Sequence, residues 1–209
     1  VLTVGERVSR DVREEIRRIW GCRISDAYAT AETGLVAIEC PDRGVYHLQE
    51  EISRTEIVGD DGKPCPPGVP GYLVSTGLYN FAMPLLRYRF NDLVVAGPAC
   101  SCGRGLPVLT DIPGRKASLF RHRDGTLFVP ELSTLRIKQI TGAREWQLTQ
   151  LAPDRYTMAL RLDRHPDAAQ AGALASYLRT ALGPAEIAIT IADSFPRSSG
   201  GKFYPLRVG

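Results

Sequence analysis

Long uncharged apolar runs are absent from this sequence of 209 residues. Each apolar stretch is interrupted by glycine, proline or a charged residue well before the roughly 18 residues that a membrane-spanning helix needs. Glu6 and Arg7 interrupt the first apolar stretch before a signal-like core of about 7 to 15 residues can form. We therefore expect a cytoplasmic protein with no membrane partner. Because the sequence begins with Val1, we expect the start of the gene product to lie upstream.

Blocks of like charge are missing as well. Lysine and arginine number 26 against 23 aspartate and glutamate residues, a net charge of +3, and these charges are dispersed along the chain. The sequence therefore lacks the basic footprint of a nucleic-acid-binding protein. A content of 44% hydrophobic and 23% charged residues is that of a globular protein and excludes disordered, collagen-like and coiled-coil classes.

Cysteine is present but does not form the pattern of a secreted disulfide framework. Five cysteines occur in a long chain without a signal segment, which favours a reducing compartment. The closely spaced pair in ACSCG then needs another explanation, and metal binding is the first to consider.

The first half of the chain divides into a helix and a β-rich region. Apolar residues between Val8 and Trp20 have helical spacing, with Ser9 as an N-cap and Gly21 as the stop. The arginines of this segment, from Arg10 to Arg18, are expected mostly on its solvent side. Short apolar or alternating runs between residues 44 and 97, separated by glycine and proline clusters, predict strands.

The second half predicts a small α+β domain. Its order is a hairpin over 121–129, a helix over 130–139, strands at 145–151 and 156–162, a helix over 166–182 and a strand over 187–191. In the long helix, Pro166 suits the first turn and Gly183 the end. We place a boundary within 111–115 and predict domains 1–113 and 114–209.

Four local strings carry polar residues suited to chemistry: DAYATAETG at 26–34 with Glu32, LLRYRFNDL at 85–93 with Asp92, IPGRKASLF at 112–120 with Arg115, and FPRSSGGKFYPLRV at 195–208 with Lys202. Taken singly, each residue also suits a solvated loop, a turn cap, a surface charge or a chain end. Their order and spacing favour a functional interpretation.

These strings resemble the adenylate-forming superfamily, and within it the phenylacetate-CoA ligase-like group that includes capsule-biosynthesis relatives. YATAE resembles that family's Tyr-Gly-x-Thr-Glu segment, RYRFND its Tyr-Arg-x-Gly-Asp, GRKAS its Gly-Arg hinge, and SSGGKF its glycine-lysine signature. AMPLLRYR and CSCGRGLP are similar to this subgroup in particular. The resemblance runs from about Gly5 to Val208 and covers only the latter half of a normal family member.

The resemblance implies an α/β (α+β) fold in which 1–113 is the β-rich end of the large AMP-binding domain and 114–209 is the small mobile C-terminal domain. It implies an AMP-forming ligase that activates an acyl or aryl acid with ATP and then forms a CoA thioester. The implied roles are these: Glu32 holds Mg2+, Asp92 takes the ribose hydroxyls, Arg115 contacts the nucleotide, Lys202 bridges the carboxylate and the α-phosphate, Tyr28 packs near the adenine, and Ala29 and Thr30 line the acid pocket.

The sequence departs from the family pattern at several positions. Ala29 replaces a glycine, Ala31 a hydroxyl residue, Asn91 a glycine, and Ala117 and Ser118 the hinge carboxylates. No Ser/Thr/Gly-rich phosphate loop precedes Tyr28, so we expect a missing N-terminal half or a partner subunit. The sequence leaves several alternatives undecided. The acyl group could be transferred to an amine or a carrier protein, or the chain could be a catalytically silent subunit or a zinc-stapled interaction module. A homodimer is also compatible with the sequence.

Cys40, His47, Cys100 and Cys102 form the candidate metal site. Thiolates and imidazole are the ligands that structural zinc prefers, and a Cys-x-Cys turn can present two sulfurs to one ion. The resembled subgroup has cysteine and histidine in matching strings. Separate thiols and a strand histidine on a polar face are the alternative.

Overall fold

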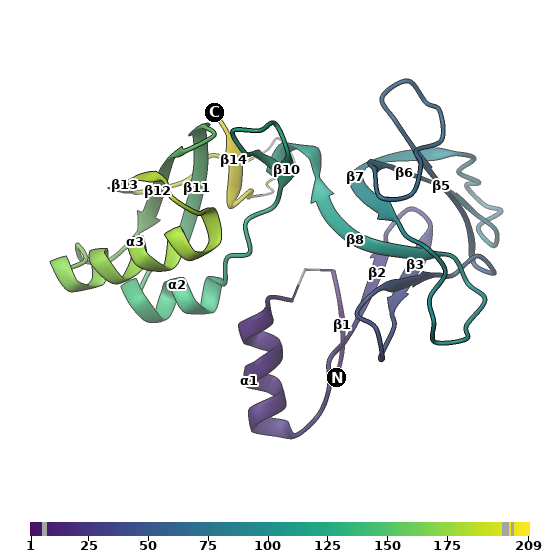
Figure 1. Ribbon diagram of the computed structural model, residues 1–209, viewed down its shortest axis with the longest axis horizontal. Helices are drawn as coiled ribbons and strands as arrows, with labels where there is room; N and C mark the ends of the chain where they lie inside the picture. The colour runs from purple at the N-terminus through teal and green to yellow at the C-terminus, as the bar shows by residue number, and fades with distance from the viewer. Residues whose placement is uncertain (6–7, 198–200, 202) are drawn as a thin grey trace. The chain divides into compact units, whose positions relative to one another are not determined.

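The computed structural model describes residues 1–5, 8–197, 201 and 203–209 (Figure 1). These residues form two compact units, unit 1 over Val1–Lys116 and unit 2 over Ala117–Gly209. The fold is mixed α/β and rich in sheet, as the sequence predicts. No helix of the described residues is long and apolar enough to cross a membrane.

Unit 1 is built on an eight-stranded sheet with the order β1-β2-β3-β4-β8-β7-β6-β5. Among the described residues β1 and β2 are its one parallel pair, and all its other neighbours are antiparallel. The strands are β1 Leu2–Val4, β2 Ser25–Thr30, β3 Gly34–Glu39, β4 Tyr46–Leu48, β5 Ser53–Val58, β6 Pro70–Gly77, β7 Tyr88–Ala96 and β8 Val108–Arg115. The β-rich region predicted from the sequence is confirmed by β4 to β7.

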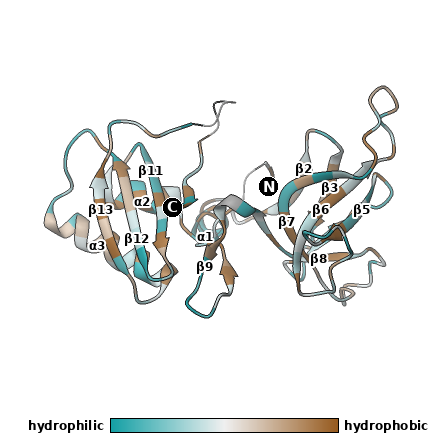
Figure 2. Ribbon diagram, turned by 90° about the horizontal axis from the view of Figure 1, so that it is seen from above, coloured by the Kyte–Doolittle hydropathy of each residue, from teal (hydrophilic) through white to brown (hydrophobic). Residues whose placement is uncertain are grey.

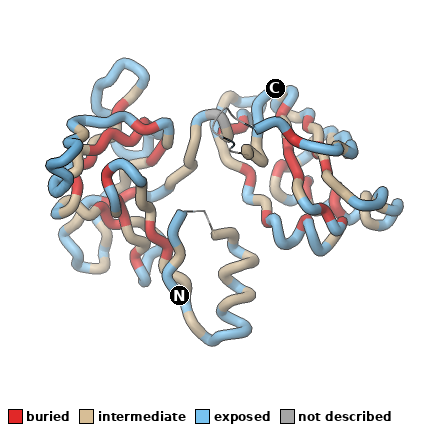
Figure 3. The backbone as a smooth tube through the Cα atoms, turned by 180° about the vertical axis from the view of Figure 1, so that it is seen from behind, coloured by how far each residue is buried: buried red, intermediate tan, exposed pale blue. Residues whose placement is uncertain are grey.

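The core of unit 1 is a modest apolar cluster of Val36, Ala37, Leu48, Leu73, Phe90, Val94 and Leu109. Buried residues follow the strands in Figure 3. Three buried hydroxyls, of Ser53, Thr55 and Ser75, have no hydrogen-bond partner in the described part of the chain. Burying a hydroxyl without a hydrogen-bond partner lowers the stability of the folded state, so these three groups make the core of unit 1 less stable than a purely apolar core.

Helix α1, Arg10–Trp20, connects β1 to β2. Gly21 ends it in a left-handed conformation, φ 63°, as the sequence predicts, whereas the Ser9 side chain makes no capping hydrogen bond. Arg10, Arg17 and Arg18 are exposed, as expected for arginines that lie mostly on the solvent side. Arg13 is half-buried and donates to both carboxylate oxygens of Glu39, at 3.1 and 3.0 Å. The ion pair fixes α1 to β3.

Unit 2 packs two helices on a four-stranded sheet with the order β13-β12-β11-β14. Its elements are the 3-10 turn Lys116–Ser118, which begins in unit 1, β9 Phe120–Arg121, β10 Leu127–Phe128, α2 Thr134–Thr141, β11 Glu145–Ala152, β12 Arg155–Arg161, α3 Ala168–Leu182, β13 Glu186–Ile191 and β14 Leu206–Val208. Along β12 the buried residues Tyr156, Met158 and Leu160 alternate with more exposed ones, as expected for a strand with one face toward the core. Figure 2 shows hydrophobic, brown segments on both β11 and β12.

Two helix starts differ from the sequence prediction. Helix α2 begins at Thr134 rather than at residue 130, because Ser133 caps it by accepting from the amide of Arg136. Helix α3 begins at Ala168, so Pro166 lies outside it; Asp167 is the cap and forms a capping box with Gln170. In both cases a side-chain cap, rather than the proline, fixes the first turn.

Candidate functional site

Tyr28, Asp92 and Arg115 come together from three strands of unit 1. The hydroxyl of Tyr28 on β2 donates to Oδ2 of Asp92 on β7 at 2.7 Å. Asp92 and Arg115 are cross-strand partners in β7 and β8, with Arg115 Nε 3.8 Å from Asp92 Oδ1. The Asp92 side chain is 25% exposed, so its oxygens can still accept hydrogen bonds from a ligand.

The electrostatics of this group keep the Tyr28 hydroxyl protonated. Burial raises the pKa of Tyr28 far above the ordinary value of a phenol, and the negative charge of Asp92 raises it further. A neutral phenol is a donor, so Tyr28 fixes one oxygen of Asp92 and leaves the other toward Arg115. Tyr28 therefore acts on Asp92 by orienting it.

The turn between β2 and β3 presents Glu32. Thr30 Oγ1 accepts from the amide of Thr33 at 3.1 Å, and its hydroxyl lies 3.0 Å from that of Thr33. Gly34 has φ 81°, a conformation that favours glycine. With the turn fixed in this way, the Glu32 side chain is exposed, next to the exposed Ala31.

Ala29 and Thr30 are half-buried on β2. A register shift in the pairing with β3 falls between Tyr28 and Ala29. Thr30 uses its hydroxyl within the turn. Lys202, the remaining sequence candidate for chemistry, lies outside the described residues, as does the side chain of Ala117.

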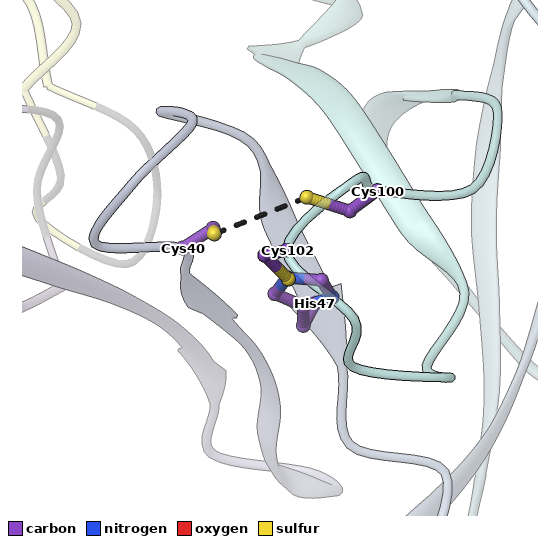
Figure 4. Close-up of side chains that lie close together, drawn as sticks. All are labelled: Cys40, His47, Cys100 and Cys102. Carbon is purple, nitrogen blue, oxygen red and sulfur yellow. Dashed lines mark hydrogen bonds between the residues drawn. The ribbon is translucent and has the colours of Figure 1, made fainter.

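The four candidate metal ligands converge in unit 1 (Figure 4). Cys40 follows β3, His47 lies on β4, and Cys100 and Cys102 lie in the connection between β7 and β8. Cys40 Sγ is 3.9 Å from Cys100 Sγ, Cys102 Sγ is 3.3 Å from His47 Nε2, and all four ligand atoms lie within 4.8 Å of one another. This cluster could hold a metal ion.

The geometry of the cluster suits a tetrahedral ion with sulfur ligands. A Zn–S distance of about 2.3 Å gives about 3.8 Å between two sulfurs of a tetrahedron, close to the Cys40–Cys100 separation of 3.9 Å. The backbone amide of Arg104 and the neighbouring Cys100 side chain lower the pKa of Cys102 to about 6, which favours the thiolate that a metal needs. Cys40 and His47 are buried, and Nδ1 of His47 has no partner among the described residues.

Arg104 was not among the sequence candidates, although it stands two residues after Cys102. Its guanidinium lies 3.9 Å from Cys40 Sγ and 3.9 Å from a carboxylate oxygen of Asp42. Arg104 also borders a cavity of about 580 Å³ between β5 and the 97–107 segment, whose lining includes neither Tyr28 nor Asp92. An ion at the cluster would hold the segment that forms one wall of this cavity.

The contact between Tyr28 and Asp92 is the feature that sequence reasoning missed. The two residues are 64 positions apart, and no periodicity or spacing signals their hydrogen bond. The equivalent bond from Tyr46 to Asp26, at 2.9 Å, was missed for the same reason.

Comparisons with known proteins identify the fold. Phenylacetate-coenzyme A ligase of Thermus thermophilus is 36% identical over 109 residues, which are 50% of this chain and 24% of the ligase. 2-Hydroxyisobutyryl-CoA ligase in its postadenylation state superposes with a TM-score of 0.62 at 20% identity, over 94% of this chain and 44% of that chain. o-Succinylbenzoate CoA synthetase of Bacillus subtilis, in complex with its acyl-adenylate intermediate, gives a TM-score of 0.61 at 17% identity, over 98% of this chain and 44% of that chain.

The chain has the fold of the adenylate-forming CoA ligases. The resemblance predicted from the sequence motifs is thereby confirmed, although no family model matches the sequence. The chain spans less than half the length of these ligases.

Proposed function

We propose that this chain is the C-terminal part of an AMP-forming ligase that activates an acyl or aryl acid and transfers it to CoA. In this proposal residues 1–113 complete the large AMP-binding domain and residues 114–209 form the mobile C-terminal domain. The observation that carries it is the convergence of Tyr28, Asp92 and Arg115, three residues to which the ligase resemblance assigns nucleotide contacts.

The reaction has two steps. A carboxylate oxygen of the acid attacks the α-phosphorus of ATP, the bond to pyrophosphate breaks, and an acyl-adenylate forms. The sulfur of CoA then attacks the acyl carbon, AMP leaves with the electron pair of the acyl–oxygen bond, and the thiol proton is released. Catalysis of such transfers depends on positioning and on stabilising the developing charge.

The residues of the chain supply that positioning. Asp92, oriented by Tyr28, accepts hydrogen bonds from the ribose hydroxyls, and Arg115 contacts the nucleotide beside it. Lys202 contributes the positive charge between the acid and the α-phosphate. Ala29 and Thr30 border the acid, for which an aryl acid is favoured.

In this proposal Glu32 holds Mg2+. Mg2+ is usually bound through one or two carboxylates together with substrate phosphates, and an exposed glutamate on a fixed turn fits that use. When bound, the ion would neutralise charge on the phosphates. Transfer to an amine or carrier protein instead of CoA leaves these roles unchanged.

Binding of ATP tests the proposal. Calorimetry with Mg2+ would be carried out on this chain alone and together with the polypeptide encoded immediately upstream, followed by an aryl acid screen for pyrophosphate release. We expect binding and pyrophosphate release with the upstream polypeptide present. Absence of ATP binding in both preparations would favour a catalytically silent relative.

We also propose that Cys40, His47, Cys100 and Cys102 bind one structural Zn2+ in a cytoplasmic protein. Four protein ligands leave no open position for chemistry, so the ion would join β3, β4 and the 97–107 segment. Elemental analysis should return about one zinc per chain, and the Cys100→Ser, Cys102→Ser double variant should lose it. A metal-free preparation of full stability would contradict this site, whereas Cys22→Ser is the control that should retain zinc.

A further inference from the structure

The β1–α1–β2 segment is the one parallel crossover among the described parts of unit 1. Leu2, Thr3 and Val4 of β1 pair with Ser25, Asp26 and Ala27 of β2 in parallel register. Helix α1 forms the connection between these two strands. Parallel strands with a helical crossover occur in sheets that are covered on both faces.

Polar contacts hold this segment in a defined position. Thr3 Oγ1 donates to Asp26 Oδ1 at 2.8 Å, and the Tyr46 hydroxyl donates to the other oxygen of Asp26 at 2.9 Å. Glu39, which binds Arg13 of α1, also accepts from the amide of Asp26 at 2.9 Å. Both β1 and α1 are therefore fixed to the sheet rather than frayed from it.

The apolar side chains of the same segment lack a cover. All eleven residues of α1 are described and none is buried, as its tan and pale blue tube in Figure 3 shows. Trp20 is 64% exposed and Ile19 57%, while Leu2 and Val4 of β1 are 68% and 61% exposed. Among the described residues, no strand pairs with the other edge of β1.

An ordered edge strand with apolar side chains and an open row of backbone groups is a template for another strand. We propose that β1 and α1 form the docking surface for the part of the ligase fold that this chain does not contain, which adds a strand along β1 and an apolar layer against Ile19 and Trp20. The lengths of the relatives argue for this occupant, because the structural match leaves more than half of each solved ligase outside it. The inference rests on the ligase function proposed above.

Trp20 provides the test. The chain has two tryptophans, so in the Trp146→Phe variant Trp20 is the one tryptophan of this chain that fluoresces. On addition of the polypeptide encoded immediately upstream, Trp20 emission should shift to shorter wavelength. Hydrogen exchange of the unmodified chain should show the β1 amides protected in the complex, which keeps the test independent of the Trp146 variant.

A surface variant gives the energetic test. Ile19→Lys places a cation in the last turn of α1, where the helix dipole tolerates it, and removes apolar contact area. Its affinity for the upstream polypeptide should fall at least tenfold. The matched control is Leu135→Lys on α2, an exposed leucine in unit 2, which should bind like the unmodified chain.

Four outcomes would overturn the docking surface. The first is no association with the upstream polypeptide, and the second is association without a change at Trp20 or β1. The third is a Trp20 shift that grows with the concentration of this chain alone, and the fourth is Trp20 emission typical of a buried indole in the monomeric chain alone. The third would assign the face to a second copy and the fourth to a cover within the chain. The proposed ligase function fails separately, when the complex forms through Trp20 yet releases no pyrophosphate with any acid.

Discussion

Unit 2 buries eleven side chains in one apolar cluster, whereas the main cluster of unit 1 has seven, although unit 1 is the longer. Among its described residues unit 1 also contains three buried hydroxyls without hydrogen-bond partners, four converging candidate metal ligands and a largely charged helix, α1, with no buried residue. The difference indicates that unit 2 stabilises itself with its own core. We expect unit 1, by contrast, to gain part of its stability from the zinc proposed at its four converging ligands.

The largest expected effect is a loss of catalytic rate, caused by substitution of a residue in the C-terminal part of the chain. Lys202→Ala in the complete enzyme should slow acyl-adenylate formation by about 1,000-fold, the upper range for loss of one preorganised donor to developing charge. Thiolysis of a supplied acyl-adenylate should be spared, because the resemblance implies that the C-terminal domain rotates this lysine away for the second step. Each half-reaction is measured by product release.

Lys138→Ala, which removes an exposed lysine from α2, is the control and should leave both half-reactions unchanged. Equal losses in both half-reactions of the Lys202 variant would indicate a folding defect instead.

Removal of the proposed zinc should affect unit 1 alone. At free zinc about 1,000 times the dissociation constant, binding stabilises the folded state by about 4 kcal/mol, and a chelator removes that contribution. Calorimetric unfolding measures the shift, and Trp146 fluorescence in a Trp20→Phe background marks the transition of unit 2. If the two units lost stability equally on chelation, the comparison between them would be wrong.

Truncation of a buried side chain in the core of unit 2 should destabilise unit 2 and leave unit 1 unchanged. Leu174 on α3 is fully buried, and Leu174→Ala should destabilise unit 2 by about 3 kcal/mol through lost burial and a cavity. The transition of unit 1 should not move. Leu135→Ala, at an exposed position of the neighbouring helix, is expected to change stability by no more than about 0.5 kcal/mol.

The smallest effect concerns the orientation of Asp92. Tyr28→Phe removes a hydrogen bond to a charged group, worth about 1.5 kcal/mol, and should weaken ATP binding about tenfold in the complete enzyme. Calorimetry of the variant measures it.

Tyr46→Phe is the matched control, because it removes a bond of the same type, to Asp26, within the same sheet. An equal loss of ATP affinity in both variants would show a general effect on the sheet and not a role for Tyr28.

The sequence predicted the elements whose signals are local. Helical spacing and Gly21 gave α1, and the chemistry of cysteine and histidine singled out the four ligand atoms that converge. The sequence could not predict the parallel pairing of β1, because a strand of three residues has no detectable periodicity and its partner strand lies more than twenty residues away. The bond between Tyr28 and Asp92 likewise depends on how three distant strands meet, which only the tertiary structure decides.

The order of strands in unit 1 has a consequence for its synthesis. Tyr46 and His47 of β4 pair with Leu109 and Val108 of β8, so β4 gains this neighbour only after about sixty further residues have been made. Pairings this distant in sequence form slowly. We therefore expect the β2–β4 meander to have one unpaired side during translation while the β5–β7 hairpins form. Cys40 and His47 should then meet Cys100 and Cys102 last. We expect metal capture to complete the folding of unit 1, not to begin it.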